Sequence, residues 1–284
     1  MQIKTIGILG AGSMGNGIAQ LAAQAGYQVI MRDIEERFIE TGFKTIQNFL
    51  SKSVEKGKIT EEHKKEILAK IKGTTRMEDL KDVDFVIEAV FEDLELKKNV
   101  FKQLDELIRS DVILTSNTSS MSITEIATST KRPEKVAGMH FFNPAPLMRL
   151  VEVVRGMHTS DDTVRTIKEM AKNMRKEPVE VKKDTPGFIV NRLMTPHLLE
   201  AIKILEEGVA SIEDIDKAVK LGLNYPMGPF ELMDLTGIDI ALYVADYLYK
   251  ELNKELKWCA PTLLKSMIRA GKLGKKTKKG WYNY

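Results

Sequence analysis

The sequence has little cysteine, little histidine and little net charge, and these scarcities narrow the function. Cys259 is the single cysteine, so an internal disulfide framework is excluded, a cysteine-based metal site is disfavoured, and a reducing compartment is expected. Lys and Arg (43) nearly balance Asp and Glu (40), which argues against nucleic acid as the main partner. Apolar runs of the roughly 20 residues that span a bilayer are also lacking. We therefore expect a cytoplasmic protein that has no resident metal and no membrane partner.

The order of strand-like and helix-like segments predicts the fold class. With 284 residues, 43% of them hydrophobic, the chain is long enough for two domains. Apolar β-branched runs alternate with helical segments, as in a doubly wound, mostly parallel sheet of the Rossmann type. Strands are expected at residues 3–9, 27–33, 84–90, 112–115, 136–139 and 150–154, and the clearest helix at 95–109. Residues 34–72 are too long for a simple crossover and predict an inserted helical hairpin.

A turn signal at residues 184–187, Asp-Thr-Pro-Gly, marks the predicted domain boundary. Strand-like sequence largely stops after it. We expect residues 1–184 to form the Rossmann-like domain and residues 185–284 to form an all-helical domain. Its helices are predicted at 188–207, 211–221, 228–250 and 260–271.

A glycine-rich segment at residues 10–15 has the pattern G-x-G-x-x-G between the first strand and the first helix. In a dinucleotide-binding fold, Gly10 makes the tight turn, Gly12 lets pyrophosphate approach the backbone, and Gly15 lets the helix pack on the strand. Ser13 and Met14 lie in the same loop, where the amides at the helix start would hold the phosphates. Because of the context between strand and helix, the motif predicts a dinucleotide cofactor.

Asp33 ends the second strand, about 20 residues after the glycines, where a carboxylate accepts hydrogen bonds from the adenosine ribose. This carboxylate would repel a 2′-phosphate, which favours NAD. Arg32 beside it could pair with such a phosphate and leaves NADP as an alternative.

His140 is the histidine best placed for chemistry, because it directly follows a predicted parallel strand. Glu152 interrupts another apolar strand, where an unpaired carboxylate would be costly to bury. A carboxylate bonded to an imidazole fixes its tautomer and stabilises the imidazolium, as proton transfer alongside hydride transfer requires. Ser119, in the polar segment after a further strand, and Asn191, after Gly187, are candidate ligands of the substrate. A structural role remains the alternative for both.

Seven segments carry a resemblance to a known family. They are GAGSMGNGIAQ, IEAVFEDLELKK, SNTSS, GMHFFNPAPLMRLVEVV, DTPGFIVNRL, NYPMGPFELMDLTGID and GKKTKKGWYNY. In this order and over essentially the whole chain, they resemble the short-chain (S)-3-hydroxyacyl-CoA dehydrogenases, particularly the bacterial members that act on 3-hydroxybutyryl-CoA. The resemblance implies reversible NAD-linked oxidation of (S)-3-hydroxyacyl-CoA to 3-oxoacyl-CoA.

The resemblance also implies a role for individual residues. His140 matches the family's catalytic acid/base, Glu152 its carboxylate partner, and Ser119 and Asn191 its substrate contacts. Further positions match contacts of NAD, namely Glu92, Lys97, Asn117, Ser119, Asn143 and Lys276. The resemblance further supports a homodimer formed through the helical domain.

The predicted hairpin supplies the argument for coenzyme A. Its lysines would ordinarily be a solvated face, but the family uses this region to hold the nucleotide end of coenzyme A. Lys56 matches a family lysine, Lys52 lies beside it, and Ser119 would contact the same substrate. At Phe49 the chain departs from relatives that carry a serine.

Three alternatives stay open from the sequence. A dehydrogenase of another hydroxyacid shares the glycine-rich start but often uses a lysine as its acid/base. A non-catalytic NAD-binding protein would bind the cofactor without turnover. A piece of a larger fatty-oxidation enzyme is the third.

Overall fold

The computed structural model describes residues 3–284 and divides into two compact units, the first ending at Asp184 and the second covering Thr185–Tyr284. The described part of the first unit contains an eight-stranded sheet of order β3-β2-β1-β4-β5-β6-β7-β8. Its strands are β1 (Thr5–Leu9), β2 (Gln28–Arg32), β3 (Ile71–Thr74), β4 (Phe85–Glu88), β5 (Ile113–Ser116), β6 (Val136–Phe141), β7 (Leu150–Arg155) and β8 (Glu177–Val181). Only β6 and β7 pair antiparallel. The predicted doubly wound, mostly parallel Rossmann-like sheet is confirmed.

The two strands that the sequence did not predict lie at the two edges of the sheet. β3 carries an exposed Lys72 and a glycine, and β8 contains Pro178 between glutamates. Edge strands tolerate proline and charge because one of their sides needs no hydrogen-bonded partner. The absence of an apolar run therefore hid both strands.

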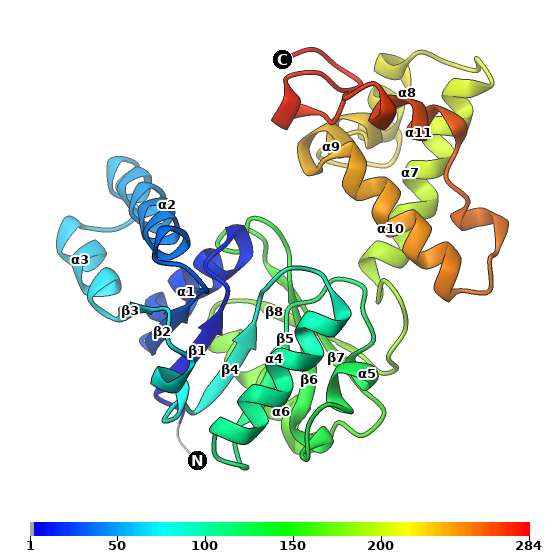
Figure 1. The fold of residues 1–284 in the computed structure, drawn as a ribbon. Coiled ribbons are helices and arrows are strands. Elements are labelled where there is room, and N and C mark those ends of the chain that lie inside the picture. Colours follow the sequence, from blue (N-terminus) through cyan, green and yellow to red (C-terminus); the bar gives the residue numbers. More distant parts are fainter. Residues whose placement is uncertain (1–2) are drawn as a thin grey trace. The chain divides into compact units, whose positions relative to one another are not determined.

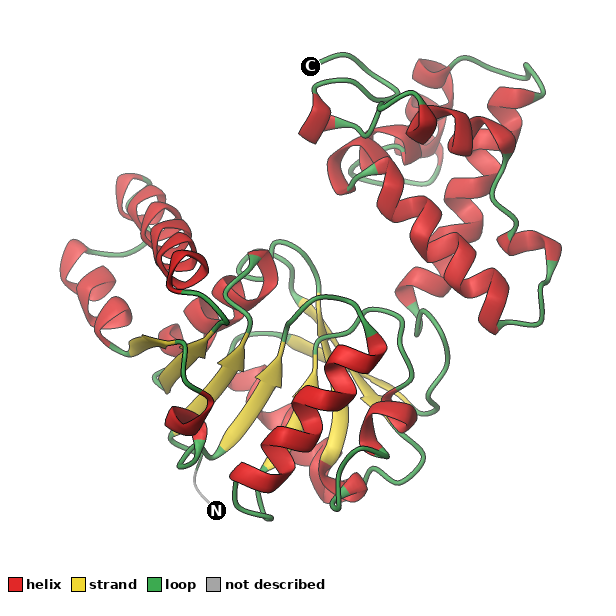
Figure 2. Ribbon diagram, viewed as in Figure 1, coloured by secondary structure: helices red, strands yellow, loops and turns green. Residues whose placement is uncertain are grey.

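Helices cover both faces of this sheet (Figure 2). They are α1 (Ser13–Gln24), α2 (Glu36–Glu55), α3 (Glu61–Ala69), α4 (Leu94–Leu107), α5 (Ile123–Ala127) and α6 (Asp161–Asn173), with 3-10 turns η1 (Met77–Leu80) and η2 (Pro133–Lys135). α2 and α3 form the predicted hairpin and lie side by side next to β3 (Figure 1). Residues 71–72, which were predicted as part of the hairpin, belong to β3 instead.

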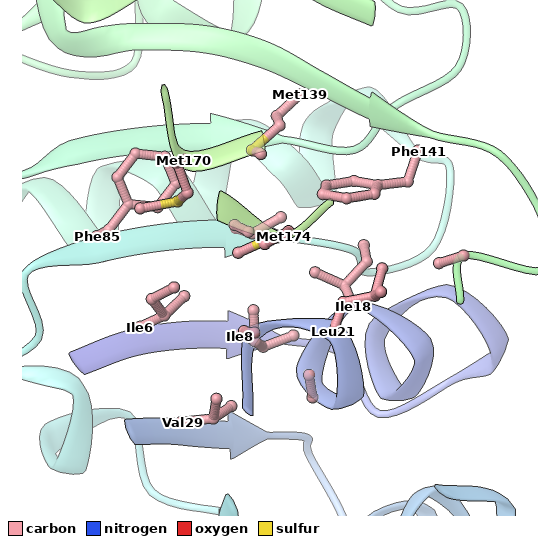
Figure 3. Close-up of a cluster of buried hydrophobic side chains, with 14 of the residues drawn as sticks. Ile6, Ile8, Ile18, Leu21, Val29, Phe85, Met139, Phe141, Met170 and Met174 are labelled. Atoms are coloured by element: carbon pink, nitrogen blue, oxygen red, sulfur yellow. The ribbon is translucent and has the colours of Figure 1, made fainter. Parts of the chain in front are cut away.

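The largest core cluster packs on one face of the sheet, against α1 and α6 (Figure 3). Alternate residues of several strands enter it, including Phe85 and Ile87 of β4 and Met139 and Phe141 of β6. Because side chains alternate across a strand, the residues between these project to the other face.

The second unit is helical throughout its regular elements (Figure 2). These are α7 (Val190–Glu206), α8 (Ile212–Gly222), α9 (Pro229–Thr236), α10 (Ile238–Glu251) and α11 (Thr262–Arg269), with 3-10 turns η3 (Leu256–Trp258) and η4 (Lys275–Thr277). The single helix predicted over 228–250 is wrong, because it breaks into α9 and α10 at Gly237. The backbone φ of this residue is 111°, a conformation that interrupts a right-handed helix. A separate core contains Phe230, Met233 and Leu264.

Candidate active site

Strand register brings four polar side chains to one region of the first unit. Glu88 of β4 lies opposite Ser116 of β5, and His140 of β6 lies opposite Glu152 of β7. All four are buried, and all four belong to the face opposite the α1 and α6 core, as the strand alternation requires. Glu88, Ser116 and His140 lie at or near the carboxyl ends of their strands, where open α/β sheets bind ligands.

His140 and Glu152 form a buried pair. The His140 Nδ1 atom lies 2.7 Å from Glu152 Oε2, and both side chains are almost entirely buried. A carboxylate can only accept a hydrogen bond, so the contact places the ring proton on Nδ1 and makes Nε2 the basic nitrogen. The Phe142 ring packs against the imidazole, with 4.4 Å between the ring centroids. The predicted pairing of the two residues is thus found in the structure.

The glycine-rich loop is shaped by backbone contacts at two of its three glycines. A Cβ at Gly10 would come within 2.4 Å of the Ala89 carbonyl oxygen, and one at Gly15 within 1.8 Å of the Gly10 carbonyl oxygen. A Cβ at Gly12 would meet no described heavy atom within 4 Å, so packing inside the chain does not explain this glycine. α1 begins directly after Gly12 with no acidic residue in its first turn, which leaves its positive end available to an anion. Exposed Ser13 and half-buried Met14 complete the loop.

Asp33 fastens the end of β2 to the same loop. Its Oδ2 accepts a hydrogen bond from the Ala11 amide at 2.6 Å, and Oδ1 accepts one from the Ile34 amide at 2.7 Å. The neighbouring Arg32 donates from Nε to the Thr75 carbonyl at 3.3 Å. A half-buried carboxylate beside the open glycine fits the ribose end of NAD, and the loop fits its phosphates.

Glu92 organises the segment that contains Ser119. Its Oε1 accepts hydrogen bonds from Thr118 Oγ1 at 2.6 Å, from the Ser119 amide at 2.8 Å and from Ser119 Oγ at 3.3 Å. Its Oε2 lies 3.3 Å from Lys97 Nζ. Lys97 is buried, and burial by itself would lower its pKa, but the carboxylates of Glu88 and Glu92 outweigh burial and raise it. The lysine is therefore a permanent cation at neutral pH.

Two asparagines join the loops around this region. Asn117 accepts a hydrogen bond on Oδ1 from the Phe141 amide at 2.8 Å, which ties the segment after β5 to the end of β6. The exposed Asn143 lies after β6, and Ser13 Oγ donates to its Oδ1 at 3.4 Å. The predicted cofactor contacts of the first unit are thus linked to one another by hydrogen bonds or by sequence proximity.

The remaining predicted site residues lie elsewhere. Lys52, in the last turn of α2, and Lys56, at its C-cap, are exposed on the hairpin. Asn191 is the second residue of α7, and the N-cap of this helix is Ile189. Lys276 lies in η4, and its Nζ is 2.6 Å from Asp239 in the second unit.

Glu88 and Ser116 were missed as site residues. Glu88 ends an apolar strand, the same signal that singled out Glu152, and the sequence therefore did contain a clue to it. Ser116 opens the polar segment SNTSS, and nothing local in the sequence distinguishes it from the serines that follow.

Within residues 3–284, no cluster of three or more His, Cys, Asp or Glu side chains could hold a metal ion. In the same residues, every helix is too short or too polar to cross a membrane.

Comparisons with known proteins agree with this geometry. Residues 5–185 match the family model "3-hydroxyacyl-CoA dehydrogenase, NAD binding domain", and residues 187–284 match "3-hydroxyacyl-CoA dehydrogenase, C-terminal domain". The 3-hydroxybutyryl-CoA dehydrogenase of Clostridioides difficile is 49% identical over 98% of this chain and 99% of its own length. The structure of (S)-3-hydroxybutyryl-CoA dehydrogenase from Ralstonia eutropha has a TM-score of 0.95 and 46% identity, covering 100% of this chain and 99% of that one. The resemblance carried by the seven segments is confirmed, and with it NAD as the cofactor.

Proposed function

The chain belongs to the 3-hydroxyacyl-CoA dehydrogenase family, and we propose that it catalyses the reversible NAD-dependent oxidation of (S)-3-hydroxybutyryl-CoA to acetoacetyl-CoA. The buried His140–Glu152 pair carries this proposal, because proton transfer at a hydroxyl needs a base whose tautomer is fixed. The four-carbon substrate is supported by the names of relatives that match almost the full chain, which are 3-hydroxybutyryl-CoA dehydrogenases.

In the oxidation, His140 Nε2 takes the proton of the C3 hydroxyl while Glu152 accepts the hydrogen bond from Nδ1 and stabilises the imidazolium. In the reduction, the imidazolium returns this proton to the substrate oxygen. When bound, NAD supplies the acceptor or donor of the hydride. Ser119 contacts the substrate oxygen, and Asn191 orients the substrate.

Two groups of residues hold the cofactor in this proposal. The loop of Gly10, Gly12, Ser13, Met14 and Gly15 surrounds the phosphates. Asp33 accepts hydrogen bonds from the ribose hydroxyls. Its negative charge selects NAD over NADP because it would repel the 2′-phosphate of NADP. The remaining contacts come from Glu92, Lys97, Asn117, Ser119, Asn143 and Lys276.

Lys52 and Lys56 hold the phosphates of coenzyme A. Both are exposed and cationic at the end of the hairpin, and this placement supports the proposal. Exposed ammonium groups bind a phosphate as mobile point charges.

The protein is proposed to be cytoplasmic. It is also proposed to form a homodimer in which the second unit provides the contact surface. Large exposed apolar side chains are concentrated in this shorter unit. They are Ile189, Leu193, Val209, Leu221, Leu223, Tyr225, Leu235, Ile240, Tyr243, Leu256 and Tyr284. Such concentrations of apolar surface are typical of association faces. Sedimentation at several protein concentrations measures the association, and a monomer at all of them would contradict it.

The reaction is tested by following NADH absorbance while the protein is mixed with acetoacetyl-CoA, with free acetoacetate as the control. Rapid NADH oxidation with acetoacetyl-CoA, but not with free acetoacetate, supports both the reaction and the coenzyme A requirement. If protein that binds NADH turns over neither compound, the proposed function is wrong. Parallel assays with NADPH test the role of Asp33, and a preference for NADPH would overturn it.

A further inference from the structure

Glu88 is the most deeply buried carboxylate next to the proposed cofactor site, and the proposed mechanism does not use it. Its Oε1 accepts hydrogen bonds from Lys97 Nζ and from the Val90 amide, both at 2.7 Å. Its Oε2 accepts one from Ser116 Oγ at 2.6 Å. The side chain is fully buried, so water does not compete for these contacts.

Two routes lead from Glu88 to Ser119. In the first, the Ser116 hydroxyl that donates to Glu88 also accepts a hydrogen bond from the Thr118 amide at 3.1 Å. In the second, Lys97 links Glu88 to Glu92, and Glu92 accepts from the Ser119 amide and hydroxyl. Thr118 and Ser119 are adjacent along the backbone, so the two routes close a ring of contacts in which one carboxylate holds both residues.

The charges of this ring are unequal. One lysine stands between two carboxylates, and both carboxylates raise its pKa. Apolar side chains of similar size would fill such a volume at similar or better stability. A buried ion pair kept at the edge of a ligand site is therefore better explained by the geometry that it imposes than by the stability that it adds.

We propose that Glu88 is a positioning residue for hydride transfer. It fixes the Lys97 ammonium, which in turn fixes the orientation in which Glu92 holds Ser119. This inference rests on the proposed function for its effect on turnover, but not for its effect on cofactor binding.

The variant Glu88→Gln keeps the shape of the side chain and removes its charge. Lys97 then pairs with Glu92 alone and draws that carboxylate away from Ser119. We expect the Kd for NADH, measured by fluorescence titration, to rise about tenfold and kcat to fall about tenfold, since a misplacement of about 1 Å can cost about 10²-fold and a smaller shift costs less. The pH profile of kcat should keep its apparent pKa, because the His140–Glu152 pair is untouched.

Asp105→Asn is the matched control. The Asp105 side chain is 7% exposed and accepts from Arg132 Nε at 2.7 Å, and it lies in the last turn of α4, whereas Lys97 lies in its first turn. The control should lower the melting temperature and leave the Kd for NADH and kcat of the folded protein unchanged. If Glu88→Gln behaves in the same way as Asp105→Asn, the positioning role is wrong.

Ser116→Ala decides the matter if Glu88→Gln does not fold. It breaks the first route only, so we expect a rise of about threefold in the Kd for NADH and a similar fall in kcat, in the direction that Glu88→Gln would take. Unchanged values would overturn the proposal. A wild-type protein that binds NADH but does not reduce acetoacetyl-CoA would refute the proposed function instead, and the positioning role would then be judged on the Kd for NADH.

Discussion

The two units of the molecule bury their charged groups against different partners. In the first unit, two pairs of buried ionisable side chains face each other: His140 of β6 faces Glu152 of β7, and Lys97 of α4 faces Glu88 of β4. In the second unit, buried Asp216 and Asp234 face backbone amides and tyrosine hydroxyls instead. The first unit thus places an imidazole, the side chain that most often transfers protons in enzymes, beside a buried carboxylate, whereas Asp216 and Asp234 serve as hydrogen-bond acceptors.

The contacts of the second unit show what its carboxylates do. Asp216 accepts from the Phe230 and Glu231 amides at the start of α9 and from Tyr282 Oη at 2.7 Å. Asp234 accepts from the Trp281 and Tyr282 amides at 2.9 Å, and from Tyr284 Oη at 3.1 Å. Burial and the neighbouring carboxylate of Asp234 raise the pKa of Tyr284 to about 12, so its hydroxyl remains a donor. These carboxylates fasten the C-terminal segment to the helices.

Of the buried ionisable groups in the two units, His140 is expected to give the largest loss of activity when it is substituted. His140→Ala removes the proposed base, and kcat should fall on the order of 10²–10⁴-fold, the usual value of general acid–base help. The control is His63→Ala, because His63 forms a similar pair with Glu66, at 3.1 Å, on an exposed helix face. Steady-state kinetics and NADH titration measure both variants. If His140→Ala turns over at nearly the wild-type rate, His140 is not the acid/base.

Glu152→Gln tests the partner of that base, with a smaller expected effect. An amide at this position can donate to Nδ1 and favour the wrong tautomer, so kcat should fall roughly 100-fold. The Kd for NADH should change little, because Glu152 contacts the imidazole rather than the glycine-rich loop. Glu66→Gln is the exposed control. A loss of NADH affinity as large as the loss of kcat would show that the pair serves binding.

The sequence predicted the chemistry of the first unit better than the fastening of the second. His140 is conspicuous because it directly follows a predicted parallel strand, and Glu152 because a charged residue in an apolar strand needs a partner. In the structure β6 extends to Phe141, and strand register and alternation put both side chains on one face. Asp216 and Asp234 lie on amphipathic helices, where an aspartate ordinarily faces water. Only long-range contacts, with Tyr282 and with the amide of Trp281, reveal that they are buried.

Glycines likewise differ in whether the local sequence predicts their role or only distant contacts reveal it. The motif at residues 10–15 is recognisable because its spacing is local. Gly280 is required for a distant reason, since a Cβ there would come within 2.0 Å of Asp234 Oδ1. Gly228 is similar, with a Cβ that would lie 2.3 Å from Asp216 Oδ1. Spacing along the chain carries no signal for such approaches.

Asp216→Asn tests whether a buried carboxylate of the second unit serves stability and not turnover. The substitution weakens the hydrogen bonds that Asp216 accepts from the Phe230 and Glu231 amides and from the Tyr282 hydroxyl. We expect the free energy of unfolding to fall by about 1–3 kcal/mol, which is measured as a melting temperature several degrees lower. The value of kcat, measured well below the melting transition, should be unchanged. Exposed Asp246→Asn is the control for the loss of one charge. A fall in kcat without a fall in melting temperature would contradict the fastening role.

The smallest effect is expected at Glu180 of β8, which represents a third class of charge, partly open to solvent. Hydrogen bonds from Lys168 and Arg155 lower its pKa from 4.5 to about 2. Because the folded-state pKa is the lower one, the stabilisation is present above pH 4.5 and is lost as the pH falls towards 2. Screening by water limits it to about 1 kcal/mol. The free energy of unfolding of Glu180→Gln should therefore lie below that of the wild type at pH 6, with a gap that narrows on acidification. A gap that does not depend on pH would show that the charge of Glu180 contributes nothing, and kcat at neutral pH should be the same for both proteins.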